Sequence, residues 1–232
     1  ELELSKKEAE LVALHSQINP HFMFNTLESI RMRSLIKGEE ETAEAIGQMA
    51  ILMRRTIYWG SDMITIREEL EFTQAYLYLQ KYRFGDKLSF WFHIKEECLP
   101  IRIPKLTIVT FVENSCVHGI EKISHAGDVS ITISANTEFL FVEISDNGYG
   151  ISEKQLAQIR EKMQNANVSM LSDAENVGIL NACLRLKSAT SNRTIFEISS
   201  QEGKGTDITI QIPLDELDGC EELMKKVDEE ND

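Results

Sequence analysis

Residues 138–150 read EFLFVEISDNGYG, and this stretch decides how the second half of the chain folds. Its first part is apolar, β-branched or aromatic, which is typical of a strand. Asp146 stands where the strand ends, and Gly148 and Gly150 follow it. A carboxylate at such a strand end can accept a hydrogen bond from an amino group, and the glycines let the backbone approach a ligand closely. An ordinary DNG turn explains the same residues, so this stretch alone leaves the choice open.

The residues around this stretch alternate between strand and helix patterns. Four further segments have strand composition, and three segments between them have helical spacing. Several strand segments follow one another like the arms of hairpins, which favours a mostly antiparallel sheet with helices on one face. The sequence therefore predicts an α+β fold in which the second half of the chain is an α/β sandwich. The expected strands are 88–94, 128–135, 138–145, 194–200 and 206–212, and the expected helices are 103–121, 152–164 and 177–189.

The first 85 residues have a different character. They are rich in Glu, Met, Leu and Gln, and helical spacing predicts three helices that end near residues 35, 59 and 84. A helical hairpin this long cannot cover its apolar faces alone, so we expect a bundle formed by dimerisation. The expected domains are a helical dimerisation domain at 1–85, an α/β domain at 86–214, and a loosely held acidic tail at 215–232.

Residues 17–25 read QINPHFMFN, with a proline directly before a histidine. Proline inside a helix removes one backbone donor and crowds the preceding turn, at a cost of about 3 kcal/mol. We expect the helix to bend just before His21, because the carbonyl of Ser16 loses its partner. At about 100° per residue, His21 projects away from the local apolar stripe, on a face that it shares with Asn25. A surface histidine and an imidazole kept accessible for chemistry both fit this position.

The composition limits the classes of partner. The chain has 232 residues, of which 42% are hydrophobic and 27% charged, and its formal charge is -14. This charge argues against a nucleic-acid surface and against docking on anionic lipid. A phosphate-bearing ligand would need help from a metal ion or from oriented backbone amides. The four cysteines lie far apart without CxxC spacing, which indicates thiols in a reducing compartment.

Three further motifs accompany DNGYG in the second half. FVENSCVHG places Glu113 and Asn114 on a helix, where an acid beside an amide can orient a water or hold a hard cation through oxygen. NVGILNACLRL places Gly178 at a helix start, where free amides and the helix dipole favour phosphate. The last motif is GKGTDITIQIP. It places Gly203, Gly205 and Thr206 at the start of a strand.

In this order, the motifs resemble those of the Bergerat-type ATP-binding fold, which histidine kinases share with gyrase-type topoisomerases, heat-shock chaperones of the ninety-kilodalton class and mismatch-repair ATPases. QINPHFMFNTLESI resembles the phosphoacceptor box of the LytS-type sensor histidine kinases. EELEFTQAYLYLQKYRFGDKLSF resembles the helix that follows this box in the same family. The resemblance covers residues from about 14 to 213. It implies that the dimerisation domain at 1–85 is also a histidine phosphotransfer domain and that 86–214 is an ATP-binding catalytic domain.

The resemblance implies a sensor histidine kinase of a two-component system, which phosphorylates His21 with ATP and passes the phosphate to an aspartate on the receiver domain of a response regulator. It places Glu113 and Asn25 with His21 in the catalytic set. It also implies a homodimer that forms the cytoplasmic region of a membrane-anchored bacterial protein, without direct membrane contact in this stretch. The chain begins inside a helical pattern without an initiating methionine, so we expect it to be part of a longer protein.

The resemblance also implies a nucleotide site. Asn114 becomes the ligand of Mg²⁺, which would neutralise ATP in this acidic chain. Asp146 would hold the adenine amino group, aided by Thr206. A mobile lid would run over about residues 149–177. The glycines that would shape the pocket and the lid are Gly148, Gly150, Gly178, Gly203 and Gly205.

The chain departs from the family pattern at three positions. Asn176 stands where relatives have a glycine, and Val117 stands where many have a lysine near the phosphates. Phe22 stands where several kinase groups have an acidic residue, so the general base for His21 is unassigned. His118 matches the pattern but equally fits a structural helix histidine. A second hypothesis therefore stays open, an ATP-gated dimerisation module without histidine phosphorylation. A third, a scaffold that binds no nucleotide, would require that the DNGYG and GKGT motifs occur by accident.

Overall fold

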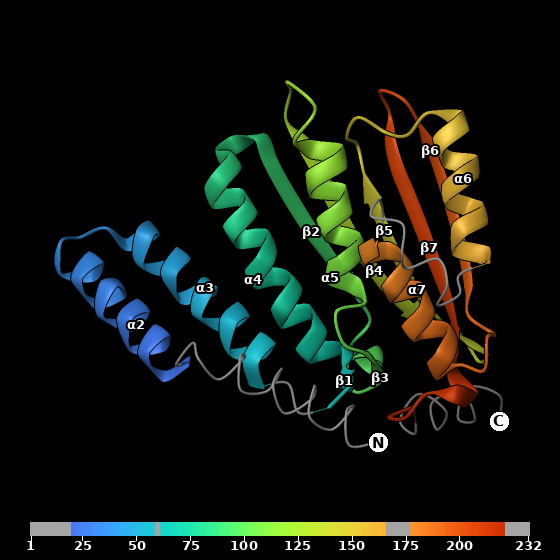
Figure 1. Cartoon of the computed structure of the whole chain (residues 1–232), viewed down its shortest axis with the longest axis horizontal. Coiled ribbons are helices and arrows are strands. Elements are labelled where there is room, and N and C mark those ends of the chain that lie inside the picture. The colour runs from blue at the N-terminus through green and yellow to red at the C-terminus, as the bar shows by residue number, and fades with distance from the viewer. Residues whose placement is uncertain (1–19, 59–60, 166–176, 221–232) are drawn as a thin grey trace, which may run out of the picture. The chain divides into compact units, whose positions relative to one another are not determined.

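The structure is a computed structural model that describes residues 20–58, 61–165 and 177–220 (Figure 1). It divides into two compact units, residues 1–59 and residues 60–232. Within the described ranges, no helix is long and apolar enough to cross a membrane.

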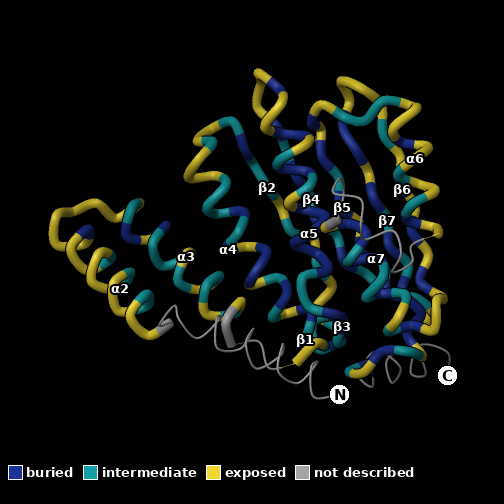
Figure 2. The backbone as a smooth tube through the Cα atoms, in the orientation of Figure 1, coloured by how far each residue is buried: buried dark blue, intermediate teal, exposed yellow. Residues whose placement is uncertain are grey.

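The first unit is a hairpin of two helices, α2 (Pro20–Ile36) and α3 (Glu40–Tyr58). These helices confirm two of those expected from the sequence. Most of α2 is exposed (Figure 2). The expected bend before His21 depends on residues 16–19, which lie outside the described part of the chain.

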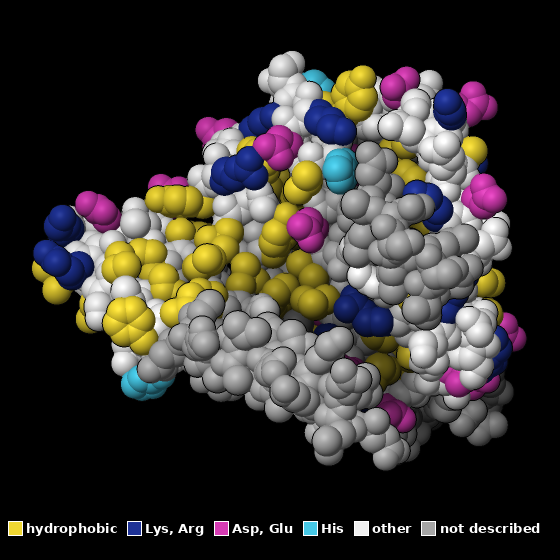
Figure 3. Space-filling view, in the orientation of Figure 1, with side chains coloured by type: hydrophobic (Ala, Val, Ile, Leu, Met, Phe, Trp, Pro, Cys, Tyr) yellow, Lys and Arg dark blue, Asp and Glu magenta, His cyan; other side chains and the backbone are white. Residues whose placement is uncertain are grey.

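The hairpin leaves much apolar surface uncovered. Its buried residues are small, Ser34, Ala43 and Ala45. Hydrophobic side chains are exposed along both helices (Figure 3). The hairpin by itself therefore buries little apolar surface. The exposed large apolar side chains are Phe22, Ile30, Met32, Leu35, Ile36, Met49 and Ile51.

The second unit is built on a five-stranded sheet. Its strands are β2 (Leu88–Ile94), β4 (Gly127–Ala135), β5 (Phe139–Asp146), β6 (Ile195–Gln201) and β7 (Gly205–Pro213). Their order across the sheet is β2-β4-β5-β7-β6. β2 lies parallel to β4, and every other neighbouring pair is antiparallel. The strands agree with the segments expected from the sequence to within one residue at each end.

One face of this sheet is covered by helices. The covering helices are α4 (Ile66–Phe84), α5 (Ile108–Asn114), α6 (Glu153–Gln164) and α7 (Val177–Ala189) (Figure 1). Burial alternates along β4 and β5, because successive side chains of a strand point to opposite faces. The buried strand side chains and the inner sides of the helices form one apolar core. The α+β class is therefore confirmed, with helices on one face of a mostly antiparallel sheet.

Two local features differ from the expectation. A short antiparallel pair, β1 (Met63–Thr65) with β3 (Arg102–Pro104), has too few residues to show a strand pattern. The helix expected over 103–121 is only α5, followed by a π-helical turn at Ser115–Ile120. Such π turns are rare and often occur at functional sites.

The compact units divide between residues 59 and 60, whereas the sequence predicts a boundary near Gly85. The difference concerns α4, whose Ile66 and Leu77 are fully buried in the core of the second unit. The three helices predicted within residues 1–85 have similar compositions. Composition alone therefore does not show that α4 packs in the second unit. The functional division near Gly85 stays a prediction.

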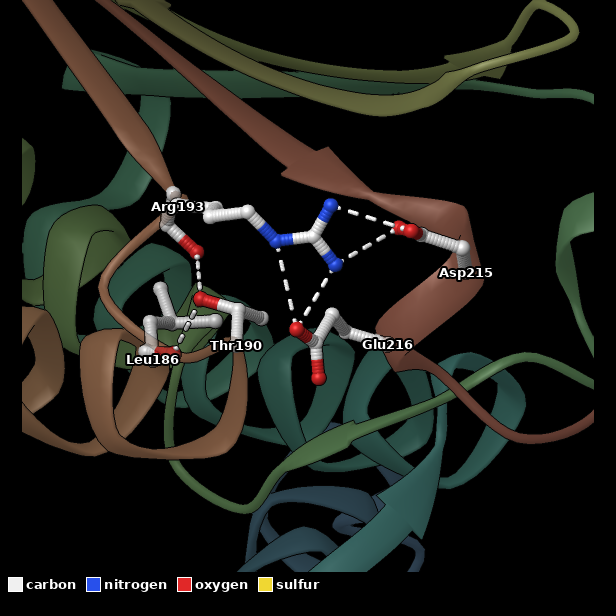
Figure 4. A network of polar contacts seen from close by, with 6 residues as sticks. Leu186, Thr190, Arg193, Asp215 and Glu216 are labelled. Atoms are coloured by element: carbon white, nitrogen blue, oxygen red, sulfur yellow. Dashed lines mark hydrogen bonds and ion pairs between the residues drawn. The ribbon is translucent and has the colours of Figure 1, made fainter.

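The start of the expected acidic tail at 215–232 is held to the second unit. The guanidinium of Arg193 pairs with Asp215 at 2.9 Å and with Glu216 at 2.6 Å (Figure 4). The first residues of this segment are therefore fixed rather than loosely held. Residues 221–232 lie outside the described part of the chain.

Candidate functional site

A cavity of about 570 Å³ opens in the second unit. Its wall takes residues from α5, the π-helical turn, α6, α7 and strands β5, β6 and β7. All four motifs of the second half contribute to it, although they are far apart in the sequence. Of the residues singled out from the sequence, those that line the cavity are Asn114, His118, Asp146, Gly150 and Thr206.

Asp146 lies at the end of β5 and is 8% exposed. Thr206 is its partner in the β5–β7 register. The Asp146 Oδ1 accepts the backbone NH of Gly148 at 2.9 Å. Burial raises the pKa of Asp146, while hydrogen bonds from the Ser115 hydroxyl and from the amides of Gly148 and Thr206 lower it. The arrangement presents a fixed, nearly buried acceptor to the cavity.

Two glycines let the surrounding backbone come close to this carboxylate. A Cβ on Gly119 would stand 2.8 Å from Oδ1 of Asp146, and a Cβ on Gly148 would stand 2.5 Å from Cα of Gly119. The backbone NH of Tyr149 donates to the Gly119 carbonyl at 3.1 Å. Gly119 is not among the residues predicted from the sequence. A glycine inside a helical pattern was the available signal, since such a glycine often has a packing or functional reason.

The loop after Asp146 also packs closely against the β6–β7 hairpin. Gly150 and Gly205 both have positive φ, 75° and 104°. A Cβ on Gly150 would collide with the Gln201 carbonyl, and one on Gly205 would collide with the Asp146 carbonyl. Only glycine fits either position without moving the backbone.

The other predicted glycines have looser surroundings. Gly203 turns the β6–β7 connection, and a Cβ there would meet no atom within 4 Å. Gly178 lies in the first turn of α7, where a Cβ would make an ordinary 3.5 Å contact with Thr110. The next residue along, Ile179, lines the cavity. Residues 166–176 of the expected lid, with Asn176, lie outside the described part of the chain.

Asn114 ends α5 and is half-buried in the cavity wall. Its Nδ2 donates to the Thr110 carbonyl at 2.6 Å. The amide nitrogen is therefore engaged, and Oδ1 is the atom that can act as an oxygen ligand. Glu113 is exposed and does not line the cavity.

Two lysines also line the cavity, Lys122 after the π-helical turn and Lys162 on α6. Helix α6 is fixed to the sheet edge, because Arg160 donates to the Ile198 carbonyl at 3.0 and 2.7 Å. Neither lysine is predicted from the sequence, because a lysine in a helical pattern usually lies on a solvated face. The two lysines bring positive charge to the cavity. Val117, the position at which the resemblance predicts a missing lysine, does not line the cavity.

His21 lies on α2 in the first unit, and its side chain is exposed. The side-chain nitrogen of Asn25, one turn further on, is 3.3 Å from Nδ1 of His21. The structure thus brings together the two residues that the sequence places on one helix face.

Two family models match the chain. The histidine kinase model matches residues 9–88, and the model of the histidine kinase-, DNA gyrase B-, and HSP90-like ATPases matches residues 104–216. Together they cover the helical stretch with His21 and the unit with the cavity.

Curated relatives match across nearly the whole chain. Sensor histidine kinase YesM of Bacillus subtilis is 29% identical over 92% of this chain and 35% of its own length. Sensor protein LytS of Oceanobacillus iheyensis is 31% identical over 94% of this chain and 36% of its own length. The chain therefore spans about a third of the length of these relatives, 35% and 36%.

Among solved structures, the histidine kinase domain of the blue-light activated histidine kinase of Erythrobacter litoralis EL346 aligns with a TM-score of 0.46. It is 14% identical and covers 85% of this chain and 86% of that one. The assignment rests on the family models and the curated relatives. The chain belongs to the histidine kinase family, with a histidine kinase region at residues 9–88 and an ATPase region at residues 104–216.

Proposed function

We propose that this chain is the kinase region of a two-component sensor, which binds Mg²⁺ and ATP in the cavity and phosphorylates His21. The observation that carries the proposal is the convergence of the ATPase motifs on one cavity with Asp146 in its wall. The same chain presents an exposed histidine in its histidine kinase region.

The cavity fits an adenine base at Asp146. The carboxylate is nearly buried and can only accept hydrogen bonds when ionised, which suits the amino group of adenine. Gly119 and Gly148 let the backbone pack directly against it, where a Cβ would collide. Thr206 lines the same wall and can assist through its hydroxyl.

The cavity also fits phosphate with a divalent cation. Asn114 offers an amide oxygen, a ligand type that Mg²⁺ prefers. Among the described residues, no group of three His, Cys, Asp or Glu could hold a metal ion. A cation here would therefore depend on the nucleotide phosphates and water for its other ligands, and it would neutralise charge on the transferred group. Lys122 and Lys162 add positive charge to the wall.

The transfer step forms one bond and breaks one. A ring nitrogen of His21 attacks the γ-phosphorus with its lone pair, the bond from this phosphorus to the β–γ bridging oxygen breaks, and ADP leaves with that electron pair. The ring then gives up its proton. Asn25 contacts Nδ1 of His21 and would orient the ring.

The uncovered apolar side chains of the hairpin support a homodimer, because a second copy of the hairpin would complete a four-helix bundle. A response regulator with an acceptor aspartate is the partner to which such a kinase would pass its phosphate. We place the region in the cytoplasm, where ATP and magnesium are available.

Incubation with labelled ATP tests this function. Label from γ-labelled ATP should enter the protein, be lost in acid and survive base, while α-labelled ATP should leave none. Binding of ATP without any covalent label would contradict the kinase and favour the ATP-gated dimerisation module.

A further inference from the structure

Helix α5, which carries Asn114, is capped by a side chain from another helix. Glu69 of α4 is fully buried, and its two oxygens accept three backbone NH groups at the start of α5. Leu106 donates to Oε2 at 2.8 Å, and Ile108 and Val109 donate to Oε1 at 2.9 and 3.3 Å. Thr107, at the local cap position, makes no cap of its own. The carboxylate of Glu69 therefore satisfies amides that would otherwise be left without acceptors.

Leu106 is the junction of this arrangement. Its φ is 58°, in the left-handed region that leucine rarely adopts. Its NH is held by Glu69, and its carbonyl accepts Thr110 Oγ1 at 2.5 Å and a guanidinium NH of Arg185 at 3.1 Å. Strained backbone of this kind persists where surrounding contacts hold it, and it tends to occur near functional sites. Side chains from α4, α5 and α7 hold it here.

A row of contacts leads from Leu106 to the cavity along one side of α5. Thr110 donates its hydroxyl to Leu106, and Asn114 donates its amide to the Thr110 carbonyl at 2.6 Å. Thr110 and Asn114 are four residues apart on α5, so they lie above one another on the helix, and Leu106 lies just before its start. The orientation of the Asn114 amide therefore depends on how the start of α5 is fixed.

We propose that Glu69 is a positioning residue that holds Asn114, through Leu106 and Thr110, in the orientation needed to bind a divalent cation with ATP. This inference rests on the proposed function. The role requires a carboxylate, because two acceptor oxygens serve three amides. Glutamine would offer one oxygen and turn an NH₂ group toward backbone NH groups.

The substitution Glu69→Gln tests the role, and Glu68→Gln is its matched control. Glu68 is the neighbouring residue on α4, but it caps α4 itself by accepting the Thr65 NH at 2.9 Å. The measurement is the Mg²⁺ concentration that gives half-maximal ATP binding, together with the affinity for adenosine. Loss of a residue that orients a metal ligand typically weakens metal binding by about tenfold or more. We expect Glu69→Gln to raise the Mg²⁺ midpoint by about tenfold and to leave the affinity for adenosine unchanged.

The readout separates positioning from a purely structural effect. Partial unfolding would lower the number of binding sites per chain without moving the Mg²⁺ midpoint. Thr110→Val, which removes the hydroxyl contact to Leu106 and keeps the shape, should move the midpoint in the same direction, and it carries the test if Glu69→Gln does not fold. Wild-type midpoints in both variants would overturn the inference. Wild-type protein that binds no ATP would instead overturn the proposed function on which it rests.

Discussion

Gly119 lies directly against the carboxylate of Asp146, so that a Cβ at position 119 would stand 2.8 Å from Oδ1 and 3.2 Å from Cγ. The contact joins the π-helical turn to the end of β5 at the wall of the cavity. Space for the adenine acceptor therefore depends on a residue that has no side chain.

Gly119→Ala should weaken ATP binding. Overpacking a tight site typically costs about 1–3 kcal/mol, so affinity should fall by about tenfold, as calorimetry can measure. Gly47→Ala is the matched control, since Gly47 is also helical and a Cβ there would lie 3.8 Å from the nearest atom, in Arg31. Equal affinities in the two variants would show that Gly119 does not protect the site.

Asp146→Asn should weaken ATP binding. The new amide would turn a donor toward the adenine amino group or toward the Gly148 NH, and an unsatisfied buried group costs about 1–3 kcal/mol. Asp128→Asn serves as the control, because Asp128 is a part-exposed acid at the start of β4, outside the cavity wall. An Asp146→Asn protein with wild-type affinity for ATP would remove Asp146 from the site.

Much of the fold was accessible from the sequence because its signals are local. Segments of β-branched and aromatic residues bounded by turn residues predict the strands, and Asp146 stands at a strand end followed by glycines. Asp146, Asn114 and Thr206 were then found by their motifs, and the structure places all three around one cavity.

The features that the sequence did not reveal depend on contacts between distant segments. Gly119 matters because Asp146 packs against it, and Glu69 matters because the start of α5 lies beside it. Neither contact can be recognised from the residues that stand next to Gly119 or Glu69 in the sequence. The position of α4 in the second unit was missed for the same reason, since helical spacing shows which face is apolar but not what covers it.

Stability should depend on pH through Glu69. Burial raises the pKa of Glu69 from 4.5 to about 7, against the lowering effect of three backbone amides and the nearby Arg185. In the unfolded chain the proton leaves near 4.5, whereas in the folded chain it stays until about pH 7. The folded state therefore loses stability as pH rises between these values, by an amount on the order of 3 kcal/mol at about 1.4 kcal/mol per pKa unit.

Chemical denaturation of the wild type and of Glu69→Gln at several pH values measures this effect. The difference in unfolding free energy should change in favour of the variant as pH rises from 5 to about 7 and then level off. Parallel pH profiles for the two proteins would show that Glu69 does not titrate in this range.

The most direct test of the kinase assignment compares the wild type with His21→Gln after incubation with γ-labelled ATP and Mg²⁺, with ATP affinity measured on both proteins. His21 and the cavity belong to different compact units, so the variant should bind ATP like the wild type. We predict acid-labile, base-stable label on the wild type and none on His21→Gln. Acid-labile label on His21→Gln at the wild-type rate would contradict the assignment of His21 as the phosphorylated residue.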